Sequence, residues 1–341
     1  MASKTGFLRQ TAPYVRDPRV SVERMMYDVL IALLPITIFT IWKFQMVAVW
    51  IILVSIVSML GTEYLYYKVK KEPFTLKNGS ILISAIIFAL IMPDQSPLWI
   101  VFIGGVFGAY FGKVAFGGLG ANIFNVAGFA RVFVMLSFGT FLTYQVDAID
   151  GVAGATVLGQ INQSFDMMIL DQVNLGAMLT GVGEPGSMGE GNVIAILLGG
   201  VYLFFRRSFD WRIPAVYLGT FFGLTLIAGL VTGAGLLYPV VQLLTGGVIF
   251  GAIFMATDPI TAPVTGPGRI YFAFGLAVLT YFIRVFGALP EGVVFAILIM
   301  NMFVPAFDYY KWANSRFTKK SIIGFSIVIV LTIALLIVGV V

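Results

Sequence analysis

The sequence predicts an all-α polytopic membrane protein. Its 341 residues are 59% hydrophobic and only 11% charged, and the mean hydropathy is +0.98. Soluble domains carry about 25% charged residues, and the apolar runs of this chain are spread along its whole length. We therefore expect a bundle of transmembrane helices and not a soluble domain with a single anchor.

Eleven apolar runs are candidate transmembrane helices. A helix needs about 20 apolar residues to cross the hydrocarbon core of a bilayer, and several of these runs are shorter. We expect the short runs to be tilted or broken helices that pack against protein. The predicted spans are Tyr27–Trp42, Met46–Tyr67, Gly79–Met92, Leu98–Ala115, Ile123–Phe138, Gly191–Phe205, Ile213–Val231, Val241–Thr257, Arg269–Phe286, Pro290–Asp308 and Ser321–Val341.

Positively charged residues indicate how these spans are oriented. Lys and Arg cluster in segments 1–26, 68–77, 206–212 and 309–320, whereas segment 139–190 has six Asp or Glu residues and neither Lys nor Arg. Cytoplasmic loops carry the excess of Lys and Arg, and counting spans from a cytoplasmic N-terminus places all four basic segments on that side. We therefore predict a multi-pass protein of the cell (inner) membrane, with segment 139–190 on the periplasmic or extracellular side.

The two halves of the chain share short patterns. Phe116–Leu119 (FGGL) is echoed by Phe286–Leu289 (FGAL), each between the fourth and fifth spans of its half. Two blocks of five spans have opposite orientations, as in the inverted repeats of many transporters; the alternative is a chance recurrence of glycine-rich tetrapeptides. The pattern predicts two inverted repeats of five transmembrane helices plus an extra C-terminal helix. The expected regions are a cytoplasmic segment 1–26, a first repeat 27–138, an extracytoplasmic loop 139–190, a second repeat 191–308, and a basic connection with the extra helix in 309–341.

The chain contains no Cys and no His. This excludes iron–sulfur clusters held by its own thiolates, disulfides, and haem or metal sites that depend on histidine. An electron carrier in this chain must therefore be organic or belong to a partner, and we predict neither a resident metal nor a catalytic side chain. The net charge of +5 does not predict nucleic-acid binding, because the basic residues lie in short loops between apolar runs.

Polar residues near the fifth span are candidate ligand-binding residues. Asn122 and Asn125 follow the glycine-rich stretch 117–120. Glycine lets a backbone approach a flat ligand closely, and two Asn residues three apart offer amide donors and acceptors on one helical face. The alternative is a glycine-rich turn followed by an Asn helix cap. Arg131 falls inside the span, where a charge is costly and marks a functional site by default. Arg284, near the end of the ninth span, can instead extend its charge to the membrane surface.

Thr156 is a candidate attachment point in the acidic segment 139–190. It is preceded by Gly154 and Ala155. A threonine hydroxyl can be esterified by phosphate, and its small neighbours leave room for an attaching enzyme. The alternative is an ordinary Gly-Ala turn outside the membrane.

Taken together, these segments resemble the RnfD/NqrB family. This family comprises the membrane-bound D subunit of the Rnf ion-translocating oxidoreductase complex and the homologous B subunit of the Na⁺-translocating NADH:quinone reductase. Gly154-Ala155-Thr156 is similar to the S/T-G-A-T sequence at which the family attaches FMN to threonine through a phosphoester. Other similar segments occur in the same order: 27–35, 117–125, 186–190, 211–214, 254–259 and 292–305.

The resemblance implies a ten-helix inverted-repeat fold with covalent FMN on Thr156, on the extracytoplasmic side. It also implies a non-covalent riboflavin near Asn122 and Asn125. Electrons would pass to and from iron–sulfur clusters and flavins of neighbouring subunits, coupled to Na⁺ or H⁺ translocation. Such a chain is one subunit of a translocase-class oxidoreductase and is not expected to be active alone. The short N-terminus favours the Rnf protein; the alternatives are its quinone-reductase homologue, a redox-free channel or transporter, and a docking scaffold without flavin.

The sequence departs from the family pattern at three places. Ala153 stands where the family usually has Ser or Thr, so one hydroxyl beside the acceptor threonine is missing, although the acceptor Thr156 is kept. Val126 stands in place of the usual Pro. The run Ser321–Val341 exceeds a ten-helix plan. We still expect Thr156 to carry FMN.

Overall fold

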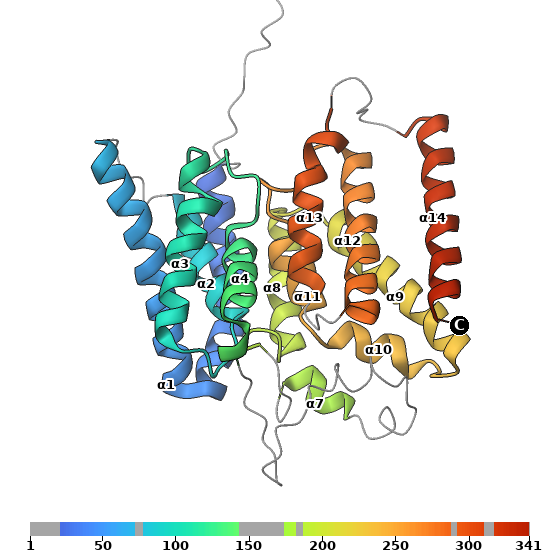
Figure 1. The fold of residues 1–341 in the computed structure, drawn as a ribbon, viewed down its shortest axis with the longest axis horizontal. Coiled ribbons are helices and arrows are strands. Elements are labelled where there is room, and N and C mark those ends of the chain that lie inside the picture. The colour runs from blue at the N-terminus through green and yellow to red at the C-terminus, as the bar shows by residue number, and fades with distance from the viewer. Residues whose placement is uncertain are drawn as a thin grey trace, which may run out of the picture.

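The computed structural model describes residues 21–71, 78–142, 174–181, 187–287, 292–309 and 317–340. Every regular element in these ranges is a helix, and the ranges contain no strand. The helices stand side by side in a bundle (Figure 1). The predicted class, an all-α membrane protein, is therefore confirmed.

Helix α1 (Val22–Lys70) contains the first two predicted spans. Its 49 residues are interrupted at Gln45, whose φ of 49° and ψ of −130° are not helical. The chain bends back at this residue, so that both ends of α1 lie at the same end of the bundle, at the top of Figure 1. The helix begins at the cap Ser21, whose hydroxyl accepts a hydrogen bond from the backbone N–H of Arg24 (3.1 Å).

The other helices of the first half are shorter. They are α2 (Ser80–Leu90), α3 (Leu98–Gly112), η3 (Val114–Phe116), α4 (Val126–Phe138) and η4 (Gly139–Phe141). Helix α1 packs against α2 and α3, and α3 packs against α4. The contact between α3 and α4 depends on Gly108, because a Cβ atom there would lie only 2.4 Å from the Cβ of Ala130. Small residues allow this close approach of membrane helices.

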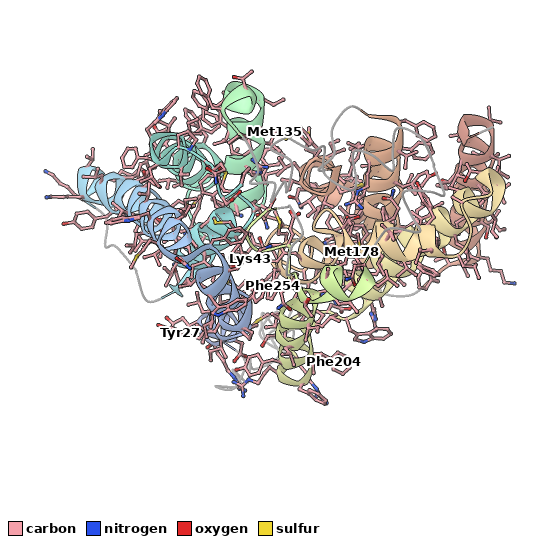
Figure 2. All side chains as sticks on the ribbon, turned by 90° about the horizontal axis from the view of Figure 1, so that it is seen from below. Tyr27, Lys43, Met135, Met178, Phe204 and Phe254 are labelled. Carbon is pink, nitrogen blue, oxygen red and sulfur yellow. The ribbon has the colours of Figure 1, made fainter. Side chains whose placement is uncertain are left out.

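The second half begins after the short helix α7 (Leu175–Thr180). It comprises α8 (Val193–Arg206), α9 (Arg212–Thr232), α10 (Leu237–Leu244), α11 (Val248–Phe250), the π-helix η5 (Gly251–Met255), α12 (Gly266–Phe286) and α13 (Gly292–Phe307). The segments α10 and α11–η5 are bent by 61° at the break between them. The predicted span 241–257 is thus a broken helix. Figure 2 shows the two halves side by side from below, in blue to green and in yellow to red.

The packing order of the first half recurs in the second. As α1 packs against α3 and α3 against α4, so α9 packs against α12 and α12 against α13. The two halves also meet directly, through α1 and α8 and through α4 and α13. An inverted repeat would produce this order, and the inverted relation itself stays a prediction. Three helices end or begin with a basic residue: α1 ends at Lys70, α8 ends at Arg206 and α14 begins at Lys319. These ends of the three helices lie at the top of Figure 1. This is the end that we predict to be cytoplasmic.

Helix α14 (Lys319–Val340) stands at the edge of the bundle (Figure 1). Of the described helices that are long enough to cross a membrane, it contains the most apolar 18-residue stretch, and it packs against α9. Within the described ranges, five helices are long and apolar enough to cross a membrane, or six with the bent pair counted as one. The bent α1 counts once there. The four shorter apolar helices are 80–90, 126–141, 193–206 and 292–307.

Candidate functional site

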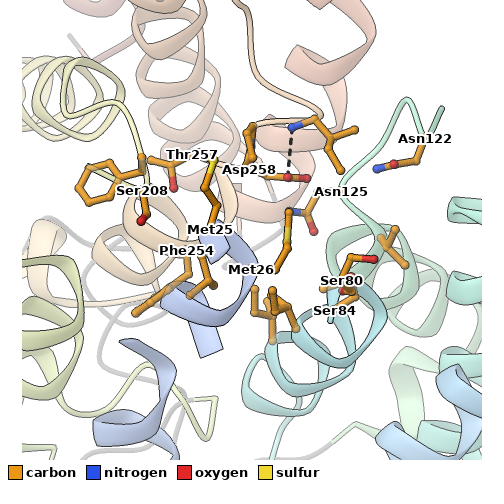
Figure 3. A pocket seen from close by; sticks show the side chains of 18 of the residues that line it. Met25, Met26, Ser80, Ser84, Asn122, Asn125, Ser208, Phe254, Thr257 and Asp258 are labelled. Carbon is orange, nitrogen blue, oxygen red and sulfur yellow. Dashed lines mark hydrogen bonds between the residues drawn. The ribbon is translucent and has the colours of Figure 1, made fainter. Parts of the chain in front are cut away.

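A polar pocket lies between the two halves, at the end of the bundle where α1 begins and α8 ends. Figure 3 shows its walls, with Asn122 and Asn125 facing Thr257 and Asp258 across it. The cavity volume of the pocket is about 60 Å³. Its lining mixes apolar side chains such as Phe254 with buried polar ones. It is narrow, and a flat ligand would occupy it only by parting these side chains.

The glycine-rich stretch forms one rim of this pocket. Gly117, Gly118 and Gly120 have φ values of 113°, 92° and 93°, a region that only glycine adopts at little cost. A Cβ atom on Gly118 would lie 2.4 Å from the hydroxyl oxygen of Tyr67. The predicted glycine-rich turn is therefore confirmed.

Asn125 holds three elements together. Its Oδ1 accepts a hydrogen bond from the backbone N–H of Gly128 (3.1 Å) and so caps α4. Its Nδ2 donates to the carbonyl of Met255 at the end of η5 (3.3 Å), and its backbone N–H donates to Oδ1 of Asn301 on α13 (3.1 Å). The helix-cap interpretation is confirmed. The interpretation that placed both Asn residues on one helical face is wrong, because Asn122 lies in the loop before α4.

Asn122 is buried, with 7% of its surface exposed. Its Nδ2 donates to the carbonyl of Phe124 (3.2 Å), whereas its Oδ1 accepts no hydrogen bond from any residue in the described ranges. A buried acceptor without a donor costs about 1–3 kcal/mol. This oxygen is therefore suited to accept an N–H of a ligand in the pocket.

Asp258 lies on the opposite wall, just after η5. Its carboxylate accepts hydrogen bonds from the backbone N–H of Ile260 (3.2 Å) and from the hydroxyl of Thr261 (3.1 Å). The carbonyl of Thr261 in turn accepts a hydrogen bond from Nδ2 of Asn301 (3.0 Å). Asn301 therefore connects the turn that carries Asp258 to the cap formed by Asn125, and fixes the two walls relative to each other.

A buried ion pair forms the third wall. The Nζ atom of Lys113 lies 2.8 Å from Oε1 of Glu63 and 2.8 Å from the hydroxyl oxygen of Ser80. Lys113 is 2% exposed and Glu63 is 4% exposed. Burying two charges is costly unless they are paired and hydrogen-bonded, and this pair joins α1, α2 and the end of α3. Lys113 lies inside a predicted span, where a charge is costly and marks a candidate functional residue. The same argument selected Arg131 from the sequence. It applies equally to Lys113, which we did not include among the predicted site residues.

Arg131 lies away from the pocket. It is 2% exposed on α4, and its Nη1 is 3.9 Å from the sulfur of Met92, beyond the end of α2. It does not line the pocket. The structure brings Asn122 and Asn125 together and does not bring Arg131 to them.

Arg284 is buried as well, with 1% of its surface exposed. Its guanidinium donates to the carbonyls of Gln242 (2.7 Å) and Gly246 (2.8 Å), at the break between α10 and α11, and it lies over the ring of Phe221. The interpretation that this side chain extends to the membrane surface is wrong. The last carbonyls of a helix carry partial negative charge, and Arg284 neutralises those at the end of α10.

The predicted attachment site, Gly154, Ala155 and Thr156, lies outside the described residues. The described residues before this segment end at Leu142, after η4. Those after it begin at Asn174, which caps α7. Both η4 and α7 are at the lower end of the bundle in Figure 1, opposite the pocket.

Comparison with known proteins identifies the family of this chain. A family model described as NQR2, RnfD, RnfE matches residues 8–316. The D subunit of a proton-translocating ferredoxin:NAD(+) oxidoreductase complex of Clostridium ljungdahlii is 35% identical over 315 residues, which cover 90% of this chain and 95% of that protein. The D subunit of a Na(+)-translocating ferredoxin:NAD(+) oxidoreductase complex of Acetobacterium woodii is 34% identical over 316 residues, covering 92% and 94%. The D subunit of an ion-translocating oxidoreductase complex of Halorhodospira halophila is 32% identical, covering 92% and 95%. The chain belongs to the NQR2, RnfD, RnfE family.

Proposed function

We propose that this chain is the D subunit of an Rnf-type complex, a membrane protein that carries electrons and couples their transfer to translocation of Na⁺ or H⁺. The similarity to such D subunits over nine-tenths of the chain carries this proposal. One of these relatives is named for protons and the other for Na⁺, so we leave both ions in the proposal. The proposed partners are subunits that carry iron–sulfur clusters and flavins, because this chain has no Cys or His to hold such clusters itself.

The proposed carrier within this chain is FMN, bound covalently through its phosphate to the hydroxyl of Thr156. The Gly154-Ala155-Thr156 sequence and the absence of thiolate and imidazole ligands support it. An isoalloxazine ring takes up and gives back electrons, and a phosphate tether leaves that ring unmodified, so that surrounding protein groups tune it.

The test is the covalent flavin content of the chain. After expression with the complex and its flavin-attaching enzyme, we expect a fluorescent band on a denaturing gel and an FMN adduct on the peptide that contains Thr156. Thr156→Ala should abolish both, whereas the control Thr180→Ala, in α7, should leave both unchanged. An adduct that survives Thr156→Ala would refute the assigned position, and a colourless parent protein would refute the flavin.

A second, non-covalent flavin in the pocket is the proposed role of Asn122 and Asn125. The buried Oδ1 of Asn122, which lacks a donor among the described residues, supports it. The N3–H edge of an isoalloxazine or a ribityl hydroxyl is a suitable donor. In flavin extracted by acid from the purified complex, Asn122→Ala should lower the non-covalent fraction and leave the covalent fraction unchanged. An unchanged non-covalent fraction would remove Asn122 from the site.

The proposed ion path uses two carboxylates, each of which follows a short apolar helix. Asp94, which is buried, follows the end of α2, and Asp258 follows the end of η5. The C-terminal end of a half-helix within a membrane carries partial negative charge and attracts cations. In vesicles that contain the complex, Asp94→Asn and Asp258→Asn should each reduce ion uptake per electron transferred while the covalent flavin content stays constant. Normal uptake in both variants would exclude these carboxylates from the path.

A further inference from the structure

The groove between α13 and α14 is a candidate binding site that the proposed function does not use. It is lined by α12 along its floor and by α13 and α14 at its sides, with Phe274, Phe303 and Phe325 among its apolar residues. Its volume is about 1300 Å³, against about 60 Å³ on the same measure for the polar pocket. Small-molecule pockets enclose about 300–1,000 Å³, so the groove suits a larger apolar ligand.

Contacts near the start of α14 hold the groove open. The hydroxyl of Ser321 is hydrogen-bonded to the hydroxyl of Tyr271 on α12, and the ring of Phe325 packs against the rings of Tyr271 and Phe274, with centroids 5.0 Å apart in each case. Near the other end, Gly339 abuts the ring of Phe286. Helix α14 thus packs against α9, contacts α12 through these side chains, and stands away from α13, as Figure 1 shows.

Charge is confined to one end of the groove. Lys319 and Lys320, together with the hydroxyl groups of Thr318 and Ser321, lie where α14 begins. The other lining residues in the described ranges are apolar, apart from Tyr271 near the same end and Thr332 on α14, and none of these described residues is acidic. A ligand that fits has a negatively charged head and a long apolar body.

The length of the groove matches one leaflet of a bilayer. It extends along α14 from Thr318 to Thr332, which at about 1.5 Å per residue is about 21 Å. Half of a bilayer that measures about 40–45 Å with its headgroups is about 20–22 Å. A partner's transmembrane helix would instead need an apolar surface across both leaflets, about 30 Å of hydrocarbon.

We propose that this groove binds an anionic phospholipid of the leaflet that we predict to be cytoplasmic, with its phosphate at Lys319 and Lys320 and its acyl chains between α13 and α14. The match to the family ends at residue 316, before α14 begins. One side of the lipid site is therefore formed by a helix that lies outside the matched residues, and the lipid would seal this helix against α12 and α13.

The experiment compares lipids that co-purify with the full complex, measured by mass spectrometry after extraction. The parent complex should retain phosphatidylglycerol or cardiolipin in preference to phosphatidylethanolamine. The double variant Lys319→Gln/Lys320→Gln should lower this preference by roughly tenfold or more, because each lysine near an anionic surface contributes about fivefold. The matched control Lys68→Gln/Lys70→Gln removes two lysines from the end of α1 and should leave the preference unchanged.

A second variant fills the groove without crowding the helix. A Cβ atom on Gly324 meets no atom within 4 Å, so Gly324→Phe should exclude the acyl chains and lower total retained anionic lipid at an unchanged thermal midpoint. Gly61→Phe on α1 is its control, because Gly61 also has open space around its Cβ position. Equal lipid retention in every variant would overturn the proposal, as would equal retention of zwitterionic lipid. If Gly324→Phe releases a partner protein and leaves the lipid unchanged, the occupant is a helix and the proposal fails.

Discussion

The buried pair of Glu63 and Lys113 should be strongly coupled. At their separation of 2.8 Å, two unit charges attract by about 6 kcal/mol at an effective dielectric constant of about 20. The cost of removing both ions from water, several kcal/mol each, offsets most of this attraction. Replacing either partner alone, with Glu63→Leu or Lys113→Met, should cost about 3–5 kcal/mol, because one charge stays buried without its counterpart. The double variant should lie within about 1–2 kcal/mol of the parent protein.

The assay measures the thermal midpoint of unfolding in detergent, with tryptophan fluorescence as the signal. At about 2 °C per kcal/mol, the value for large domains, each single variant should lose about 6–10 °C and the double variant should recover most of that loss. Arg206→Met is a useful control. Its partner Asp28 keeps hydrogen bonds from Ser208 and Tyr202, and the Arg206 side chain is 39% exposed, so its loss should change the midpoint much less than either single variant of the buried pair. If the double variant loses as much as the sum of the two single variants, the charges act independently and the reasoning fails.

Two further predictions concern packing and capping. Gly108→Ala should lower the thermal midpoint by the equivalent of about 1–3 kcal/mol, because the new methyl group would lie 2.4 Å from the Cβ of Ala130. The control Gly61→Ala should not lower the midpoint, because no atom lies within 4 Å of its Cβ position. Equal midpoints for the two variants would show that α3 and α4 separate freely. Asn125→Ala removes the N-cap of α4, worth about 1 kcal/mol, and also removes a hydrogen-bond donor to the end of η5. The thermal midpoint of Asn125→Ala should therefore be lower than that of Asn122→Ala. The reverse order would contradict the assigned hydrogen bonds.

The sequence by itself determined the class of the fold and the break points of its helices. Hydropathy reports how each segment partitions between water and hydrocarbon, which is a local property of the chain. The short runs 79–92 and 241–257 indicated short or broken helices. The structure breaks the second, with a bend of 61°, whereas the first is a single short helix, α2, that ends at Leu90. The segment similarities indicated the family, and the match over residues 8–316 confirms it.

Only the tertiary structure decided which polar residues meet. Asn125 and Asn301 are 176 residues apart and hydrogen-bonded, and Lys113 reaches Glu63 across α1 and α3. Such pairs depend on the depth and rotation of each helix in the bundle, which hydropathy does not encode because an apolar helix is equally stable in lipid at any rotation. The same limit applies to Arg131 and Arg284. The sequence identified them as unusual because each is a charged residue in a predicted span, but only helix packing determined which groups they contact. For the same reason the apolar sequence of α14 did not predict the groove beside it. The groove exists because α14 does not fill the space beside α12 and α13.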